Sequence, residues 1–312
     1  MHLSPAVSIN KLSFAYKNRL ALQEVTIEVN QGEIFGLLGP NGSGKTTLFR
    51  ILSTMALPSR GQASIFGYDV GNDSEYVRRS IGVVFQSFAL DKKLRVRENL
   101  FRHGQLYGLT GSLLRSRIES VLRSLGIWER KEELVETLSG GLQRRVEIAK
   151  GLLHQPKLLL MDEPSTGLDP GARIELWRIL SQLRNEQKTT ILLTTHILEE
   201  AERCDRLSIM DRGRVIVTGT PQQLKKSIGG DIVSVVPFDP ERLTKGIRRT
   251  FKLTPKLVDG ILHIEKKNGH AFLPKLVQKF PNQIRSVTVG KPTLEDVFIK
   301  YTGHAFGGAE LK

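Results

Sequence analysis

The stretch Gly39-Pro40-Asn41-Gly42-Ser43-Gly44-Lys45-Thr46-Thr47 fits the pattern G-x-x-x-x-G-K-[ST] at every fixed position. The apolar run 34–38 before it predicts a buried strand, and the segment 45–54 after it predicts a helix. Glycines let such a loop wrap closely, so that backbone N–H groups point at phosphate oxygens beside the positive end of the helix dipole. This context favours a nucleoside triphosphate site over a glycine-rich turn without chemistry.

Side chains that suit phosphate and metal lie here and far downstream. Lys45 is expected to reach the β- and γ-phosphates, and the Thr46 hydroxyl is expected to hold Mg²⁺. A second apolar run, 158–161, ends in Asp162 and Glu163, and continuous apolar residues suit a central parallel strand. Asp162 can hold the metal shell, and Glu163 can polarise the attacking water. The alternative, a strand that ends in a solvated acidic pair, becomes weak once a phosphate loop is present.

Further motifs stand between and after these two. Leu138-Ser139-Gly140-Gly141-Leu142-Gln143-Arg144-Arg145 precedes the acidic pair, and Thr194-Thr195-His196 follows a later apolar run. With Gln86 in Val83-Val84-Phe85-Gln86, these motifs occur in the order typical of one family. From about residue 7 to about residue 224, the chain resembles the ATP-binding-cassette (ABC) family.

The resemblance implies a site for ATP and Mg²⁺ and assigns its residues. Glu163 and His196 match the catalytic acid and the histidine at the γ-phosphate. Thr46, Gln86 and Asp162 match the residues around Mg²⁺. The residues implied to bind the nucleotide are Tyr16, which stacks on adenine, Gly39, Pro40, Asn41, Gly42, Ser43, Gly44, Lys45, Thr46, Thr47, Gln86, Ser139, Gly140, Gly141 and Asp169. Ser165 to Asp169 match a loop that crosses the interface of a cassette dimer.

The signature stretch has two compatible interpretations and one departure from the family pattern. Ser139 can cap the helix that starts at the two glycines, and the same helix N-terminus can bind an anion. In the family this anion is the γ-phosphate held by the opposite subunit. The commonest family sequence has Gln where this chain has Leu142, with Gln143 one place later. Because the change leaves the anion-binding N–H groups untouched, we expect activity to survive.

Composition is consistent with a cytosolic enzyme. The 312 residues suffice for roughly two domains. A single cysteine, Cys204, excludes an internal disulfide and fits a reducing compartment. No apolar run approaches the ~18–20 residues that span a bilayer, so another subunit must supply any membrane spans. The net charge of +14 could attract nucleic acid or an anionic membrane leaflet, although a generic basic surface explains it equally well.

After Lys225-Lys226-Ser227-Ile228-Gly229-Gly230, which resembles a linker, the pattern changes scale. Residues 231–236, 247–253, 261–266 and 284–289 predict strands, and 272–280 predicts an amphipathic helix. A capping box at Thr293 predicts a final helix over 294–301. The ending Pro292-Thr293-Leu294-Glu295-Asp296-Val297-Phe298 resembles the C-terminal extension of ABC-2 type exporter ATPases of the drug-resistance and nodulation-factor kind.

The sequence therefore predicts an α/β fold of the P-loop NTPase, ABC-cassette class. It would combine a parallel-sheet core, an antiparallel β subdomain and a helical insert at about 92–140. The expected domains are 1–228, which binds ATP, and 229–312, a small α+β unit expected to pack beside the first and support the dimer. A second copy would form a head-to-tail dimer, because one chain has one phosphate loop and one signature.

The expected function is ATP hydrolysis that drives a separate polytopic membrane permease. The chain would be peripheral, on the cytoplasmic face of the inner (plasma) membrane, with no nucleic-acid partner. The alternative is a soluble ABC ATPase that acts on nucleic acid or ribosomes. Translation ATPases usually carry two cassettes on one chain, and this chain carries one. DNA-repair ATPases separate the two corresponding motifs by very long coiled coils, whereas only 116 positions separate Lys45 from Asp162 in this chain.

Overall fold

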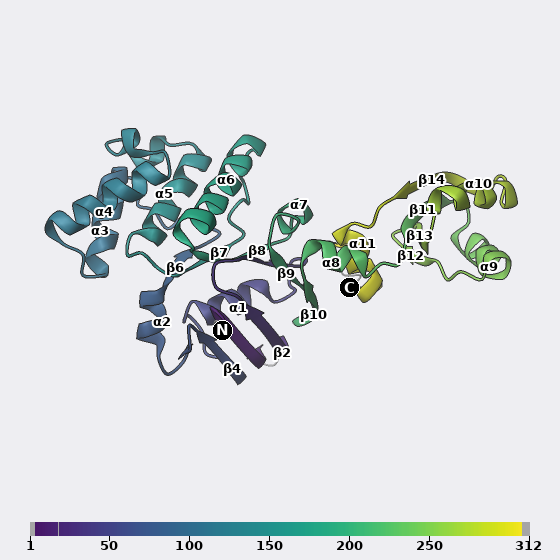
Figure 1. The fold of residues 1–312 in the computed structure, drawn as a ribbon, viewed down its shortest axis with the longest axis horizontal. Helices are drawn as coiled ribbons and strands as arrows, with labels where there is room; N and C mark the ends of the chain where they lie inside the picture. Colours follow the sequence, from purple (N-terminus) through teal and green to yellow (C-terminus); the bar gives the residue numbers. More distant parts are fainter. Residues whose placement is uncertain (1–3, 18, 308–312) are drawn as a thin grey trace.

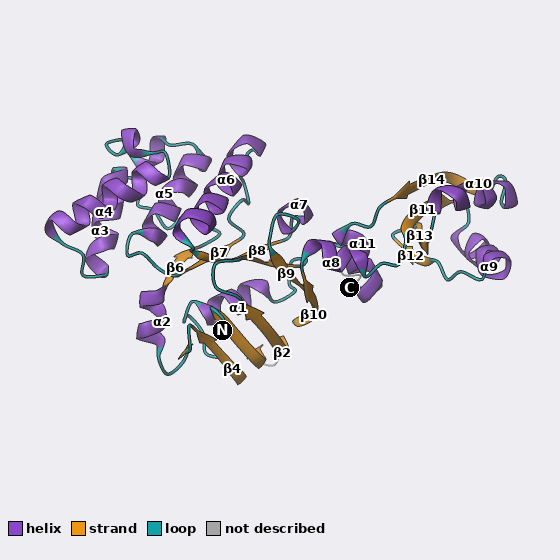
Figure 2. Cartoon of the chain, viewed as in Figure 1, coloured by secondary structure: helices purple, strands orange, loops and turns teal. Residues whose placement is uncertain are grey.

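A computed structural model describes residues 4–17 and 19–307 of the chain. The molecule is elongated, with a large main body at one end and a smaller unit at the other (Figure 1). We use "main body" for residues up to Lys226 and "C-terminal unit" for the strands and helices between Asp231 and Gly290. Figure 2 shows that most helices of the main body gather on one side of its strands.

A six-stranded sheet in the order β10-β9-β3-β8-β7-β6 organises the main body. Its strands are β3 (Ile34–Leu38), β6 (Ile81–Val84), β7 (Leu158–Asp162), β8 (Thr190–Thr195), β9 (Arg206–Asp211) and β10 (Arg214–Gly219). All neighbouring pairs are parallel except β9 and β10. Because parallel strands end at the same edge, the loops that follow β3, β7, β8 and β6 meet there.

Both faces of this sheet are buried, as the continuous apolar runs predict. Leu159 and Met161 of β7 face a core that helices contribute. Leu158 and Leu160, which alternate with them, face a second core shared with α1 and the antiparallel strands. Alternation along each strand therefore joins two separate cores through one sheet.

Two layers cover the sheet. An antiparallel sheet, β2-β1-β4-β5, consists of β1 (Val7–Tyr16), β2 (Arg19–Val29), β4 (Arg60–Ile65) and β5 (Tyr68–Asp69), with α1 (Lys45–Leu52) and α2 (Ser74–Ser80) nearby. The helical layer contains α3 (Val96–Leu106), α4 (Gly111–Ser124), α5 (Gly140–Leu152) and α6 (Pro170–Gln187), with short 3₁₀ turns at Trp128–Arg130 and Val135–Thr137. Two short helices, α7 (Leu198–Ala201) and α8 (Pro221–Lys226), complete the main body. The predicted antiparallel subdomain and helical insert are both present.

The C-terminal unit is an antiparallel sheet in the order β12-β13-β11-β14 with two helices. Its elements are β11 (Asp231–Pro237), α9 (Pro240–Phe251), β12 (Lys256–Val258), β13 (Ile261–Lys266), α10 (Gly269–Lys279) and β14 (Ile284–Gly290). The strands expected over 231–236, 261–266 and 284–289 and the helix expected over 272–280 are confirmed, although the helix starts three residues earlier.

The strand expected over residues 247–253 is wrong, because residues 247–251 form the end of α9 and residues 252–253 follow it without regular structure. Asp239 caps that helix by accepting from the Arg242 N–H at 3.0 Å, and Pro240 occupies its first turn. Ile247 then lies one turn after Leu243, so both face the core that α9 shares with β11 and β13. The helix start signal lay upstream of the apolar run that suggested a strand.

The last helix, α11 (Leu294–Thr302), joins the core of the main body and not that of the C-terminal unit. Val297 and Phe298 are fully buried among Leu207 and Ile209 of β9 and Leu224 of α8. The chain thus leaves the main body after α8, forms the C-terminal unit, and returns to dock α11 beside α8 (Figure 1). Burial of these apolar side chains is what fastens the chain's end to the main body.

We therefore expect Phe298→Ala to destabilise the main body. Deletion of a buried phenylalanine ring costs about 3–5 kcal/mol of unfolding free energy. Both tryptophans, Trp128 and Trp177, lie in the main body, so tryptophan fluorescence during urea unfolding reports this part of the chain. The matched control is Phe272→Ala in the separate core of the C-terminal unit, which should leave the fluorescence midpoint unchanged. Equal shifts from both variants would contradict the assignment of α11.

Candidate nucleotide-binding and catalytic site

The loop between β3 and α1 is a backbone cradle that only glycine permits at two positions. Gly44 has a φ of 101°, which side chains rarely adopt, and a Cβ there would lie 2.8 Å from the Ala21 carbonyl oxygen. A Cβ on Gly39 would lie 2.4 Å from the Met210 carbonyl oxygen. Close packing therefore requires glycine at these two positions of the predicted phosphate loop.

Polar groups of this loop are buried in a way that fits phosphate. The Lys45 Nζ donates to the carbonyl oxygens of Gly39 at 2.7 Å and Pro40 at 2.9 Å. Burial lowers the pKa of Lys45, and the carboxylates of Glu163 and Asp162 offset part of that effect. Within the described residues, the buried Ser43 hydroxyl has no hydrogen-bond partner. Phosphate oxygens would supply both the negative charge and the missing acceptor.

Asp162 ends β7 inside the same cluster. Its Oδ1 accepts a hydrogen bond from the Thr194 hydroxyl at 2.5 Å. Burial raises the pKa of Asp162, and the hydroxyls of Thr194 and Thr46 and the charge of Lys45 act in the opposite direction. A divalent cation beside this carboxylate would stabilise its ionised form, so Asp162 and Thr46 fit a Mg²⁺ site. Bound Mg²⁺ would neutralise charge on the phosphate oxygens.

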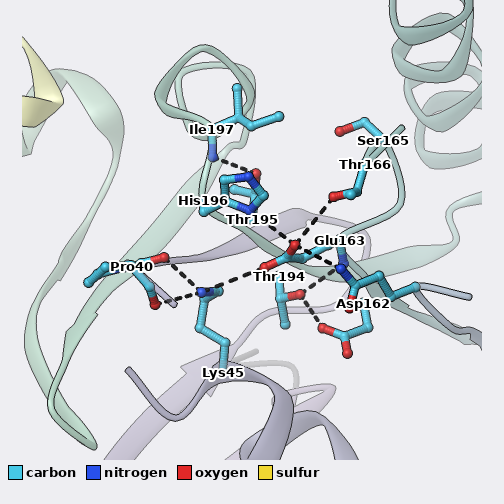
Figure 3. Close-up of polar contacts among 12 residues, drawn as sticks. Pro40, Lys45, Asp162, Glu163, Ser165, Thr166, Thr194, Thr195, His196 and Ile197 are labelled. Carbon is cyan, nitrogen blue, oxygen red and sulfur yellow. Dashed lines mark hydrogen bonds and ion pairs between the residues drawn. The ribbon is translucent and has the colours of Figure 1, made fainter. Parts of the chain in front are cut away.

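Glu163 follows directly and occupies a constrained backbone position. Its φ of 44° lies in the left-handed region, which is unusual for a residue with a side chain. The Glu163 N–H donates to the Thr194 Oγ1 at 2.9 Å, and its carbonyl accepts from the Thr166 N–H at 3.1 Å. These bonds turn the carboxylate out of the strand direction and into the cluster shown in Figure 3.

Four side chains converge on that carboxylate. The His196 Nδ1 lies 3.0 Å from Oε2, although its N–H is not aligned for a hydrogen bond. Gln86 donates to Oε2 from Nε2 at 3.4 Å, and the Thr166 hydroxyl does so at 3.3 Å. Lys45 lies 3.8 Å from Oε1 (Figure 3). Loops after β3, β6, β7 and β8 thus surround one acid that can orient or deprotonate a water.

Two positioning residues were not found from sequence. Thr194 fixes Asp162 and Glu163, as described. The buried Glu200 carboxylate accepts from the Ser165 hydroxyl and, at 2.6 Å, from the Thr195 hydroxyl. Glu200 therefore holds the start of the 165–169 loop against the end of β8. The only sequence signal for either residue was its nearness to His196.

Five further predicted residues, described next, are not part of this cluster. Ser139, Gly140 and Gly141 begin α5, where the Ser139 hydroxyl accepts from the Leu142 N–H at 3.4 Å, and Asp169 caps α6 by accepting from the Ala172 N–H at 2.9 Å. Tyr16 lies at the end of β1, 44% exposed, with its ring against Phe14. Among the described residues, no hydrogen bond or ion pair joins any of these five to Lys45 or Glu163.

Comparison with known proteins places this arrangement in context. Residues 22–166 match the family described as "ABC transporter", and residues 219–302 match the "ATP-binding protein DrrA1-3-like, C-terminal domain". The chain is 35% identical to the daunorubicin resistance ATP-binding protein DrrA3 of Streptomyces coeruleorubidus, over 96% of each chain. It is 36% identical to the Nod factor export ATP-binding protein I of a Rhizobium species (strain N33), over 96% of this chain and 97% of the relative.

A solved structure supports the fold. The dimeric post-hydrolysis state of the ATP-binding cassette MJ0796, bound to ADP and Pi, superposes with a TM-score of 0.62 at 28% identity. The match covers 69% of this chain and 98% of that one. The predicted cassette fold is therefore confirmed.

We expect Glu163→Gln to retain ATP binding and lose hydrolysis. The amide keeps the size of the side chain and its distance from Lys45 but cannot accept a proton, and a general base contributes about 10²–10⁴-fold to the rate. Nucleotide affinity is measured with a fluorescent ATP analogue, and turnover by phosphate release. Glu33→Gln is the control, because it replaces another buried acid, which pairs with Arg206 and lies just before β3, at the opposite end of that strand from the phosphate loop. Normal turnover of Glu163→Gln would exclude Glu163 as the base.

Proposed function

The chain belongs to the ABC transporter family of ATPases, and from this premise we propose that it is the nucleotide-binding subunit of an ABC-2 type exporter. ATP hydrolysis by this subunit would drive a separate membrane permease. The observation that carries the proposal is the convergence of Lys45, Gln86 and His196 on Glu163. The DrrA-like C-terminal match and the names of the relatives, which concern drug resistance and Nod factor export, favour export.

Each site residue has a distinct role in the proposed binding and hydrolysis of ATP. Lys45 and the loop N–H groups bind the β- and γ-phosphates, and Tyr16 stacks on the adenine. Thr46, Gln86 and Asp162 would hold Mg²⁺, which would neutralise charge on the phosphate oxygens. Glu163 takes the proton of the attacking water, and His196, held beside Glu163 at the end of β8, contacts the γ-phosphate.

We further propose a head-to-tail homodimer. In this arrangement Ser139, Gly140 and Gly141 act on the nucleotide that the other copy holds, together with Asp169. The argument is that these residues lie apart from Glu163 within one chain, yet form an exposed helix N-terminus suited to an anion. The dimeric state of the similar cassette bound to ADP and Pi supports it.

The membrane partner has a suitable surface on the helical layer. None of the helices in the described part of the chain is both long and apolar enough to cross a bilayer. A groove of about 700 Å³ runs between α3 and α4, with Phe101, Ile118 and Trp128 among its apolar lining and Arg97 and Lys131 at its edge. We assign this groove to a permease segment that reaches the subunit from the cytoplasmic face of the membrane. The residues that line this groove begin at Leu94, shortly after the Gln86 loop in the sequence.

Mixing two defective variants tests the dimer. Lys45→Ala removes the phosphate-binding charge, and Gly141→Asp adds a negative charge at the signature helix, where a Cβ would already lie 2.8 Å from the Ala172 Cβ. A mixed dimer has one composite site with both changes and one with neither. We expect ATPase activity in the mixture to exceed that of either variant alone.

The control mixture combines Lys45→Ala with Glu163→Gln. Both residues act on the nucleotide bound by their own chain, so each composite site of the mixed dimer carries one defect and activity should not recover. Recovery in this control, or none with Gly141→Asp, would contradict the head-to-tail arrangement. Phosphate release at equal total protein is the measurement for both mixtures.

A further inference from the structure

Helix α5 holds the loop that carries Gln86. Only the first turn of this helix has a role in the proposed catalytic mechanism. The Arg144 side chain of α5 is 1% exposed, and its guanidinium donates from Nη1 to the Phe85 carbonyl at 2.7 Å and from Nη2 to the Gln86 carbonyl at 2.8 Å. The guanidinium also lies over the Phe88 ring, 4.6 Å from its centroid. One side chain thus contacts three of four consecutive loop residues.

Two more residues of α5 form hydrogen bonds with the same loop. The Glu147 Oε1 accepts from the Ala89 N–H at 2.7 Å, and the Lys150 Nζ donates to the Ala89 carbonyl at 2.5 Å. Arg144, Glu147 and Lys150 are spaced three residues apart, so they project from one face of the helix. The backbone of the Gln86 loop is therefore fixed to α5 at both of its ends.

Burial of the charged Arg144 side chain at this position costs free energy. No carboxylate lies within ion-pair distance of its guanidinium in the described part of the chain, and its buried Nε lacks a partner there. A buried charge without an ion-pair partner, even one held by two carbonyls and an aromatic ring, costs stability compared with an apolar side chain of similar volume. Stability alone therefore does not explain an arginine at this position, whereas placement of two adjacent carbonyls by a rigid planar fork does.

The contacts between α5 and the Gln86 loop connect two parts of the proposed active site. The N-terminal end of α5 carries the signature residues, of which the N-cap Ser139 and Gly140 are exposed and Gly141 is half-buried. At its other end α5 touches β6 so closely that a Cβ on Gly82 would lie 2.2 Å from the Gly151 carbonyl oxygen. Any displacement of the signature end relative to this contact moves Arg144, and through the two carbonyls it moves Gln86. Gln86 in turn donates to Glu163.

We propose that Arg144 is a positioning residue that makes the contact between Gln86 and Glu163 depend on the position of the signature helix α5. Binding of the partner's nucleotide at Ser139–Gly141 would then adjust the amide beside the catalytic acid. The inference rests on the proposed head-to-tail dimer for its signal, but its structural part, the action of Arg144 through Gln86, is independent of the dimer.

A double-mutant cycle between Arg144→Lys and Gln86→Ala tests that part. Lysine keeps the charge, but its single ammonium cannot hold two carbonyls in the geometry of the fork. We expect Arg144→Lys to lower kcat about tenfold, the size of one lost charge-assisted hydrogen bond, with KM for ATP unchanged. In the Gln86→Ala background the same change should alter kcat by less than about twofold, because its target is gone.

Two controls make the cycle decisive. Thr194→Ala removes the hydroxyl that holds Asp162 and the Glu163 N–H, so it should lower kcat by a similar factor in both backgrounds. This result would show that kcat of the Gln86→Ala enzyme can still fall measurably. Arg145→Lys changes the neighbouring arginine, which donates to the Leu125 carbonyl and pairs with Glu175, away from the Gln86 loop. Whatever effect Arg145→Lys has should be equal in both backgrounds.

A second variant covers the case that Arg144→Lys does not fold, as judged by circular dichroism and thermal unfolding. Phe88→Leu removes the ring under the guanidinium and leaves both carbonyl hydrogen bonds possible. It should lower kcat by a smaller factor, and only when Gln86 is present. Equal losses with and without Gln86, for either variant, would overturn the proposal.

Dimerisation separates this inference from the proposed function. Glu163→Gln should form an ATP-dependent dimer in light scattering, with or without Arg144→Lys. If Glu163→Gln stays monomeric with ATP, the head-to-tail proposal fails while the cycle still decides the role of Arg144. If the dimer forms and the cycle is additive, only the inference about Arg144 fails.

Discussion

The site depends on the hydrogen bonds of one buried hydroxyl, that of Thr194 on β8. It donates to the Asp162 carboxylate and accepts from the Glu163 N–H, so it holds two consecutive residues of the neighbouring strand β7. Without this acceptor the left-handed backbone of Glu163 would lose its compensation, since such a conformation costs about 1–3 kcal/mol. The acid that Lys45, Gln86 and His196 surround is thus placed by a pairing between two central strands. Two separate cores bury the two faces of the sheet to which both strands belong.

How much of this site the sequence can predict depends on how far apart in the chain its interacting residues lie. The phosphate loop was predictable because strand, glycines and helix start are contiguous in the chain. Asp162, Glu163 and His196 were recognisable because each ends an apolar run. Thr194 was not, because its role arises from register, and β7 pairs with β8 so that Asp162 lies opposite Thr194. Sequence patterns predict which strands are buried, but register across a parallel sheet emerges only when the helices between the strands are packed.

The C-terminal region shows a different limit. Residues 247–253 resemble a strand by composition, yet the capping residue Asp239 and the four-residue spacing from Leu243 to Ile247 place the first five of them in α9. Short apolar runs are ambiguous between the two periods, and tertiary packing decides. The last helix was predicted from its capping box, but its site of burial was not. Nothing local to residues 294–302 specifies that Phe298 packs on β9 and α8, because that surface forms only after the main body folds.

Two polar networks approach Glu163 from different elements and differ in stiffness. The Thr194 network lies between paired central strands, and its backbone cannot shift without breaking the ladder of β7 and β8. The Arg144 network reaches Glu163 through a loop and the flexible side chain of Gln86, over a 3.4 Å contact that small displacements make or break. In the proposed dimer, a change in nucleotide or partner state would therefore enter through the Gln86 side, while the Thr194 side would keep Asp162 and Glu163 in place. The buried charge of Arg144 is explained in these terms, because a contact that moves with α5 needs a rigid link to that helix, and the guanidinium supplies one through two carbonyls.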